Sequence, residues 1–211
     1  MKLIGMLDSP YVRRVAISLQ LLGVDFEHHS LSVFRTFDEF SRINPVVKAP
    51  TLVCDDGEVL MDSTLILDYA EALARPRTLM PQGLDELQRS LQLIGLALAA
   101  TEKCVQVVYE HGVRPAEKLH RPWLDRVIGQ ALAAYDELER RLAARPLVVD
   151  SARIDQAGVT VAVAWHFTQR MTPEAVPAER FPHLVALSAA AESLPEFQAT
   201  PHGDSTYRRH G

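Results

Sequence analysis

The sequence predicts a mixed α/β domain followed by an all-helical domain, and three observations indicate this. In residues 1–75, short apolar runs and amphipathic stretches follow the order strand, helix, strand, helix, strand, strand, helix. From residue 84 onward, the long apolar patterns all have helical spacing. Residues 76–83 contain two prolines and no periodicity, which is typical of a linker. We therefore expect domains over residues 1–75 and 84–211.

The first domain is expected to begin with a strand at Lys2–Leu7. Ser9 is a good N-cap for the helix that follows, and Pro10 suits the first helical position, where its missing N–H costs nothing. Gly23 is expected to end this helix. Phe26–Val33 alternates weakly, as a second strand would, and Thr36–Ile43 is expected to form a short helix.

A hairpin is expected near the end of the first domain. Thr51–Cys54 and Glu58–Leu60 are short apolar runs that flank Asp55-Asp56-Gly57. Asp-Gly between two such runs is a strong hairpin signal. Asp62-Ser63 then begins a helix that continues to Leu73.

The second domain is expected to contain a long helix from Leu84, a helix after Pro122 with a clean apolar stripe, and a short helix over Phe181–Leu194. Val159–Trp165 is apolar on every side, so its helix should form the buried centre of this domain, with Asp155 as the N-cap. The last ten residues, 202–211, lack apolar periodicity and are expected to be loose.

Composition excludes several classes of protein. The net charge of −5 argues against a nucleic-acid partner, which usually leaves a basic footprint. The two cysteines, Cys54 and Cys104, have neither redox-pair nor zinc spacing, so we expect no metal and a reducing compartment. The sequence shows no signal-peptide pattern and no run of about 18 apolar residues that would span a membrane. We therefore expect a cytoplasmic protein without a membrane partner.

Ser9 is the strongest candidate for a chemical role. Its hydroxyl is expected where a strand ends and a helix begins. The first N–H groups of a helix have no internal partner, and the helix dipole favours negative charge there. A thiolate bound at this point would be stabilised. The alternative is a serine that only caps the helix.

With this organisation, the chain resembles the glutathione transferase family over nearly its whole length. The segment Ser9–Arg14 looks like the serine-type active-site turn of the tau, phi and related classes. Asn44–Leu52 is similar to the family segment that carries an invariant cis-proline, and Asp62-Ser63 matches the family's acidic-Ser pair. The resemblance implies a thioredoxin-like N-terminal domain that binds glutathione, with an all-α C-terminal domain that contributes the pocket for an electrophile.

The resemblance also implies contacts with the tripeptide. A cis Ala49–Pro50 bond would leave the Ala49 backbone groups open to the cysteinyl part of glutathione, whereas the alternative is a trans proline that opens an edge strand. Ser63 would bind the γ-glutamyl carboxylate through its hydroxyl and N–H, and Asp62 would bind the ammonium group. A simple helix cap is the alternative for this pair.

Further charged residues are weaker candidates. Lys48 would reach the glycyl or the γ-glutamyl carboxylate, or else be a solvated surface lysine, and Arg35 would approach the tripeptide. Arg13 is expected to be a solvated surface charge, although its charge would also favour the thiolate, and Arg14 is expected to be structural.

The resemblance implies an apolar pocket for the second substrate, with Tyr11, Tyr109 and Trp165 as its candidate residues. Ordinary core packing is the alternative for Tyr109 and Trp165. The chain departs from the family at the start of the buried helix, where Gly158 stands in place of the acid of a capping box. Losing the reciprocal bond would cost about 1 kcal/mol.

The expected function is transfer of the glutathione thiolate to a small hydrophobic electrophile by a homodimeric enzyme. The alternatives are a non-catalytic binding or regulatory protein of the same fold, and a glutathione-dependent isomerase, peroxidase or dehalogenase. A thiol-disulfide reductase is disfavoured, because those relatives usually carry Cys where this chain has Ser9. The sequence does not specify the electrophile.

Overall fold

A computed structural model describes residues 1–207 and divides the chain into two units. The first unit comprises Met1–Leu79 together with the C-terminal segment that starts at Ser193. The second unit is the continuous stretch Met80–Glu192. The expectation that residues 84–211 form a single helical domain is therefore wrong for the segment after Glu192, which packs with the first unit.

The first unit contains a four-stranded sheet with strand order β2-β1-β3-β4. β1 (Lys2–Ile4) pairs in parallel with β2 (Glu27–His29) and antiparallel with β3 (Thr51–Val53), and β3 pairs antiparallel with β4 (Val59–Met61). β1 is shorter than predicted because the chain turns at Gly5, whose φ of 134° lies outside the range that other residues readily adopt.

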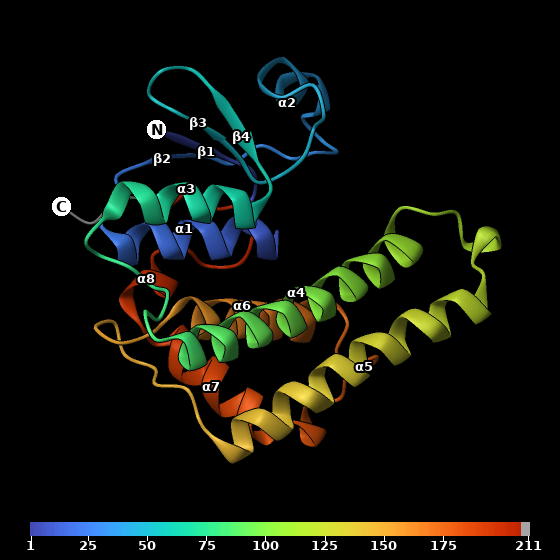
Figure 1. The fold of residues 1–211 in the computed structure, drawn as a ribbon. Coiled ribbons are helices and arrows are strands. Elements are labelled where there is room, and N and C mark those ends of the chain that lie inside the picture. The colour runs from blue at the N-terminus through green and yellow to red at the C-terminus, as the bar shows by residue number, and fades with distance from the viewer. Residues whose placement is uncertain (208–211) are drawn as a thin grey trace. The chain divides into compact units, whose positions relative to one another are not determined.

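Two helices, α1 (Pro10–Leu22) and α3 (Ser63–Ala74), pack against each other on one face of this sheet (Figure 1). α1 ends as predicted, because Gly23 adopts the left-handed conformation with φ 72°. The short helix α2 (Phe37–Ile43) connects β2 to the loop before β3. The apolar side chains of α1 and of the central strands β1 and β3 form the core of this unit.

The C-terminal segment covers one side of α1. Its helix α8 (Pro195–Gln198) packs on α1, and Arg13 of α1 is only 1% exposed. The Arg13 Nε donates to the carbonyl of Thr200 at 2.7 Å, and Nη2 donates to the carbonyl of Phe197 at 3.4 Å. The expectation of a solvated Arg13 is wrong, because a segment distant in sequence buries this face of the helix.

This segment stays packed as far as Tyr207. The Tyr207 ring stacks on Phe26 with centroids 4.7 Å apart, and its N–H donates to His28 Nδ1 at 3.0 Å. Asp204 lies 3.3 Å from Arg35. The expectation of a loose end from residue 202 is therefore wrong up to Tyr207, and residues 208–211 of that stretch lie outside the described residues.

The second unit is all-helical. It consists of α4 (Leu84–Gly112), α5 (Arg121–Ala144), α6 (Gln156–Met171) and α7 (Pro182–Glu192), with single 3₁₀ turns at Ala116–Lys118 and Ala178–Arg180. α4 packs on α5 and α6, and α7 packs on the same two helices. α6 forms the centre of the unit as predicted, because all its residues from Gln156 to Trp165 are buried.

The start of α6 explains the departure from the capping box. Asp155 is the N-cap, and its carboxylate accepts the Gly158 N–H at 2.8 Å. A Cβ added at Gly158 would lie only 2.9 Å from Cγ1 of Ile154, a core side chain that is 3% exposed. Glycine at this position makes room for Ile154, so the acid of a capping box would not fit without a shift.

The long helix α4 bears on the expectation that no segment of the chain spans a membrane. Among the helices of residues 1–207, it alone is long and apolar enough by length and composition to cross a bilayer. One face of α4 is buried against α5 and α6, as in the core helix of a helical bundle. This packing accounts for the apolar residues on that face, where the buried residues make up 39% of the most apolar 18-residue stretch of the helix.

Candidate functional site

Ser9 lies in the turn between β1 and α1, where its N–H donates to the carbonyl of Met6 at 3.2 Å. As the N-cap of α1, it has extended backbone angles, and its Oγ accepts the Val12 N–H at 3.4 Å. The residue is partly exposed, so a ligand can reach the hydroxyl. The structure therefore places an accessible hydroxyl at the N-terminus of a 13-residue helix, where the dipole favours an anion.

Asp8, which sequence reasoning left without a role, lies directly before Ser9. Burial raises the pKa of its carboxyl group, while a hydrogen bond from the Ser9 N–H and the charge of Arg35 oppose that shift. Asp204 of the C-terminal segment raises it further by repulsion. The turn that holds Ser9 thus contains a partly buried acid, and the adjacency of Asp8 to Ser9 was the only signal for it in the sequence.

The N-terminus of α3 brings Asp62 and Lys48 together. Asp62 is the N-cap, with a positive φ of 75°, and its Oδ1 accepts the Thr64 N–H at 2.9 Å. Its Oδ2 lies 3.7 Å from Lys48 Nζ, and both side chains are about half exposed at 45% and 52%. A positive φ at a non-glycine residue costs about 1–3 kcal/mol, and it persists where the surrounding structure requires it.

Ser63 lies behind this pair and is 4% exposed. It is the first residue of α3, and its Oγ accepts a hydrogen bond from Nη1 of the buried Arg14 at 3.1 Å. The same nitrogen lies 3.4 Å from the hydroxyl of Thr64. Sequence reasoning placed Ser63 in the site but gave Arg14 only a structural role.

The loop before β3 is held by side chains. Asn44 Nδ2 donates to Thr51 Oγ1 at 2.8 Å, and Thr51 Oγ1 donates to the carbonyl of Lys48 at 2.7 Å. The Ala49–Pro50 peptide bond is cis, as the resemblance implies. Within residues 1–207, no described hydrogen bond uses the N–H or the C=O of Ala49. These groups are the ones expected to pair with an extended peptide.

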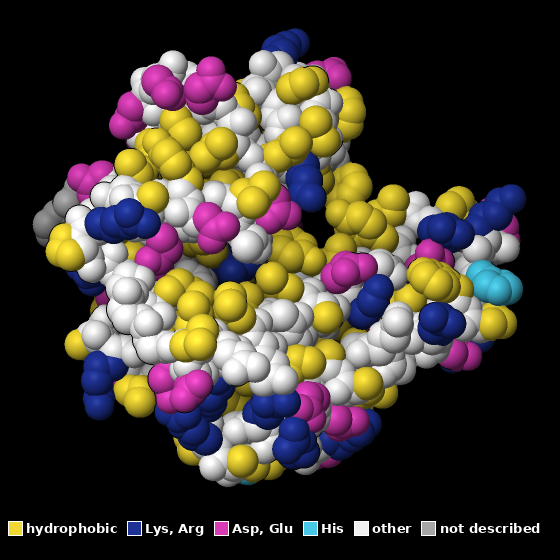
Figure 2. Space-filling model, in the orientation of Figure 1, with side chains coloured by type: hydrophobic (Ala, Val, Ile, Leu, Met, Phe, Trp, Pro, Cys, Tyr) yellow, Lys and Arg dark blue, Asp and Glu magenta, His cyan; other side chains and the backbone are white. Residues whose placement is uncertain are grey.

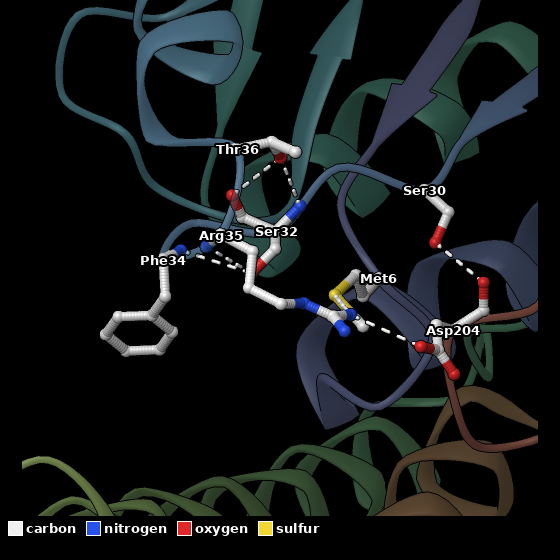
Figure 3. A network of polar contacts seen from close by, with 7 residues as sticks. All are labelled: Met6, Ser30, Ser32, Phe34, Arg35, Thr36 and Asp204. Carbon is white, nitrogen blue, oxygen red and sulfur yellow. Dashed lines mark hydrogen bonds and ion pairs between the residues drawn. The ribbon is translucent and has the colours of Figure 1, made fainter.

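Arg35 lies beside the Ser9 turn, and no described contact links it to Asp62 or Lys48. Its Nη2 is 3.4 Å from Met6 Sδ and 3.3 Å from Asp204 Oδ2, as Figure 3 shows. Ser32 fixes the backbone at this point, since its Oγ accepts the Arg35 N–H at 3.1 Å. The Arg35 hydrogen bond and charge lower the pKa of Asp204.

The three residues named for the second-substrate pocket have different surroundings. Tyr11 is partly exposed in the first turn of α1, and Tyr109 is 45% exposed on α4. Trp165 is 3% exposed, with its ring 5.3 Å from that of Tyr135 and 5.4 Å from that of Phe181. The Trp165 environment is that of the core-packing alternative.

A cavity of about 750 Å³ lies elsewhere in the first unit. It is lined by residues that include Met1, Gln20, Phe26, Cys54 and Tyr207, and by none of the predicted site residues. Cys54 is a buried free thiol whose pKa is raised by burial, so it is a poor nucleophile. In the described part of the chain, no three side chains of His, Cys, Asp or Glu are grouped to hold a metal ion.

The sequence model of the glutathione S-transferase N-terminal domain matches residues 3–78, which carry the Ser9 turn, the Ala49–Pro50 loop and the start of α3. Residues 3–78 carry the glutathione S-transferase N-terminal domain, and the chain is distantly homologous to zeta, tau and bacterial glutathione S-transferases. The fold is that of the family, with a thioredoxin-like sheet followed by an all-helical unit, as the sequence predicted.

Related proteins match this chain along nearly its whole length. The uncharacterized GST-like protein YibF of Escherichia coli is 28% identical over 95% of this chain and 98% of its own. A Pseudomonas fluorescens family member, solved with bound S-(propanoic acid)-glutathione, is 29% identical over 95% of this chain and 98% of its own, with a TM-score of 0.78. A Methylobacterium radiotolerans enzyme in complex with glutathione sulfonate is 25% identical, covers 100% of this chain and 99% of its own, and has a TM-score of 0.86.

Proposed function

We propose that this chain is a glutathione transferase that binds glutathione in its first unit and activates the glutathione thiol at Ser9. The observation that carries the proposal is the grouping of Lys48, Asp62 and Ser63 at the N-terminus of α3. This group offers a carboxylate, an ammonium and free N–H donors within a few residues. The γ-glutamyl end of glutathione carries the complementary ammonium and carboxylate. The P. fluorescens and M. radiotolerans relatives were solved with glutathione derivatives.

In the proposed complex, Asp62 accepts hydrogen bonds from the ligand ammonium, and Ser63 donates to the ligand carboxylate. The cysteinyl part pairs with the open N–H and C=O of Ala49, next to Pro50. Lys48 is the candidate partner of the glycyl or the γ-glutamyl carboxylate, and Arg35 is placed to approach the tripeptide. Arg35 already faces Asp204, so the ligand would share or replace that contact.

Ser9 supplies the activation. A free thiol has a pKa of about 8.5 and is mostly protonated at neutral pH, whereas the thiolate is the nucleophile. A hydroxyl that donates to sulfur and a helix N-terminus both favour the anion, and each unit of pKa lowering corresponds to about 1.4 kcal/mol. The thiol proton leaves to solvent, and the thiolate attacks an electrophilic carbon of a small hydrophobic substrate. As the C–S bond forms, either a leaving group departs with the electron pair of its bond to that carbon, or the electron pair of a double bond moves to the neighbouring atom, which then takes a proton from solvent. Tyr11 and Tyr109 are the pocket candidates that are accessible on their own units.

An apolar face on the first unit supports the expected homodimer. The side chains of Leu65, Tyr69 and Leu73 form a stripe along α3 and are 61%, 36% and 49% exposed. Val59 and Met61 of the edge strand β4 are 40% and 38% exposed. Figure 2 shows hydrophobic side chains gathered over β4 and α3. Exposed apolar surface of this kind marks association sites. A Leu65→Glu variant is expected to run as a monomer in size-exclusion chromatography with light scattering.

The same proposal places the protein in the cytoplasm. Both cysteines are free thiols, which fits the reducing cytoplasm.

Comparison of wild type with Ser9→Ala, across glutathione and a panel of electrophiles, tests the function. We expect a large loss of turnover with near-normal glutathione affinity, because the hydroxyl acts on the thiolate more than on binding. Ser41→Ala is the matched control, since Ser41 is a partly exposed helical serine whose hydroxyl donates to the carbonyl of Asp38. Equal turnover in wild type and Ser9→Ala would remove Ser9 from its role. Failure of wild type to bind glutathione would favour the non-catalytic alternative.

A further inference from the structure

Arg14 of α1 is a buried cation without a carboxylate partner. The residue is 3% exposed, and its Nη1 donates to the hydroxyls of Ser63 and Thr64. Its Nε is buried and has no hydrogen-bond partner. The nearest acid along the chain of contacts, Asp62, instead accepts the Thr64 N–H and pairs with Lys48. Within residues 1–207, no ion pair neutralises the Arg14 guanidinium.

A buried charge of this kind is costly unless an opposite charge comes close. Burial lowers the pKa of Arg14 to about 10, and the charges of Asp62, Tyr11 and Asp68 oppose that shift. The group is therefore still protonated at neutral pH. A positive charge consequently lies directly behind Ser63, at the point where the N-terminus of α3 already favours an anion.

The direction of the hydrogen bond fixes the role of Ser63. A guanidinium has donors only, so the Ser63 oxygen must accept from Arg14. The hydroxyl hydrogen is then left for another acceptor, and no described hydrogen bond within residues 1–207 uses it. Since Ser63 is the first residue of α3, its N–H also has no intrahelical partner. Ser63 thus presents two donors to a ligand while Arg14 holds its oxygen.

We infer that Arg14 is a positioning residue for a ligand carboxylate at the N-terminus of α3, acting through the hydroxyl of Ser63 and supplying the countercharge. The inference rests on the proposed function, in which that carboxylate belongs to the γ-glutamyl group. Arg14 thereby selects tripeptides that retain this carboxylate over analogues that lack it. Arg14 itself does not touch the ligand, and its contribution is electrostatic and directional.

The test compares two ligands by isothermal titration calorimetry: glutathione and 4-aminobutanoyl-Cys-Gly, which is the same tripeptide without the γ-glutamyl carboxylate. Arg14→Met should weaken glutathione binding about tenfold to a hundredfold and analogue binding less than about twofold, as expected for loss of one charge a few ångströms from the carboxylate. Arg14→Lys keeps the charge and should recover part of the glutathione affinity. Ser63→Ala should reduce the wild-type preference for glutathione over the analogue.

Circular dichroism checks that each variant is folded. If Arg14→Met does not fold, the two single variants Ser63→Ala and Arg14→Lys still decide the test. Equal loss of affinity for the two ligands in the variants would show a purely structural role and overturn the inference alone. Absence of glutathione binding by wild type would overturn both this inference and the proposed function.

Discussion

Arg13 is expected to hold the C-terminal segment on the first unit, and Arg13→Met tests this. The methionine keeps an apolar stem of similar length and removes the guanidinium. Two carbonyls, those of Thr200 and Phe197, then lose their donors inside a buried region. The variant should therefore be less stable, although the residue lies only four positions after the proposed active-site residue Ser9.

The expected decrease in the free energy of unfolding follows mainly from these two hydrogen bonds. A hydrogen bond from a charged donor contributes about 1.5–3 kcal/mol, and the 2.7 Å bond from Nε to Thr200 belongs in the upper half of that range. The 3.4 Å bond from Nη2 to Phe197 is at the geometric limit and adds at most about 1 kcal/mol. The guanidinium also lies 5.7 Å from the Phe197 ring centroid, for about 0.5 kcal/mol more. Relief of guanidinium burial offsets part of this, which leaves a loss of about 3 kcal/mol.

The assay must report on the first unit. Both tryptophans, Trp123 and Trp165, lie in the second unit, so tryptophan fluorescence follows the wrong part of the chain. Urea unfolding followed by circular dichroism, together with hydrogen exchange of residues 10–22 and 195–200, reports on α1 and α8 directly. With a urea m-value of about 2 kcal/mol per molar, the midpoint should fall by about 1.5 M.

Arg121→Met is the control, because Arg121 is exposed and its one ion pair among residues 1–207 is an i,i+4 pair with Asp125. That pair is worth about 0.5 kcal/mol at most. If Arg13→Met lowers stability no more than Arg121→Met, or if exchange of residues 195–200 is unchanged, the account of the C-terminal segment is wrong.

Three further changes have definite expected outcomes. Asp62→Asn keeps an oxygen for the Thr64 N–H but removes the negative charge. Glutathione affinity should therefore fall about tenfold, while the melting temperature changes little. Unchanged affinity in calorimetry would show that another residue binds the ligand ammonium. Burial lowers the pKa of His28 below its ordinary 6.5, so the unfolded chain binds the proton more readily and the free energy of unfolding should fall as the pH drops below about 6.5. His28→Gln should reduce this pH dependence when urea unfolding is compared at about pH 7.5 and about pH 5.5. An unchanged pH dependence in the variant would contradict this account. Tyr135→Phe removes a hydroxyl that bonds to the Ala164 carbonyl at 3.1 Å and to Thr168 at 2.6 Å, and it should cost about 1–2 kcal/mol by tryptophan fluorescence; a loss below about 0.5 kcal/mol would show that the network is not stabilising.

Local signals accounted for most helix and strand positions. The Ser9-Pro10 start, the Gly23 stop and the Asp155 cap are each set by neighbours within a few residues, so a single sequence shows them. The predicted strands were too long. For example, apolar character runs over Phe26–Val33, but only three of these residues pair with a neighbouring strand in the sheet. Pairing partners are not visible in a short run of residues.

Contacts between distant segments were the part that sequence could not supply. Arg13 and Arg14 are adjacent and look alike, yet one bonds to carbonyls near residue 200 and the other to the hydroxyl of Ser63. An amphipathic pattern shows which face is apolar, but it does not show that a cation on that helix will be covered. Asp204 beside Arg35 has the same origin, since nothing local to residue 204 indicates a partner 169 positions earlier.

The order in which the ribosome delivers these residues has a consequence for biogenesis. The helical unit, Met80–Glu192, is an uninterrupted stretch and can mature while the chain is still being made. The first unit is synthesised earliest, but one side of its helix α1 is covered only after α8 and Tyr207 have been synthesised. A nascent polypeptide halted after Glu192 would expose the Arg13 side of α1, which makes the newest residues the last step in completing the oldest part of the molecule.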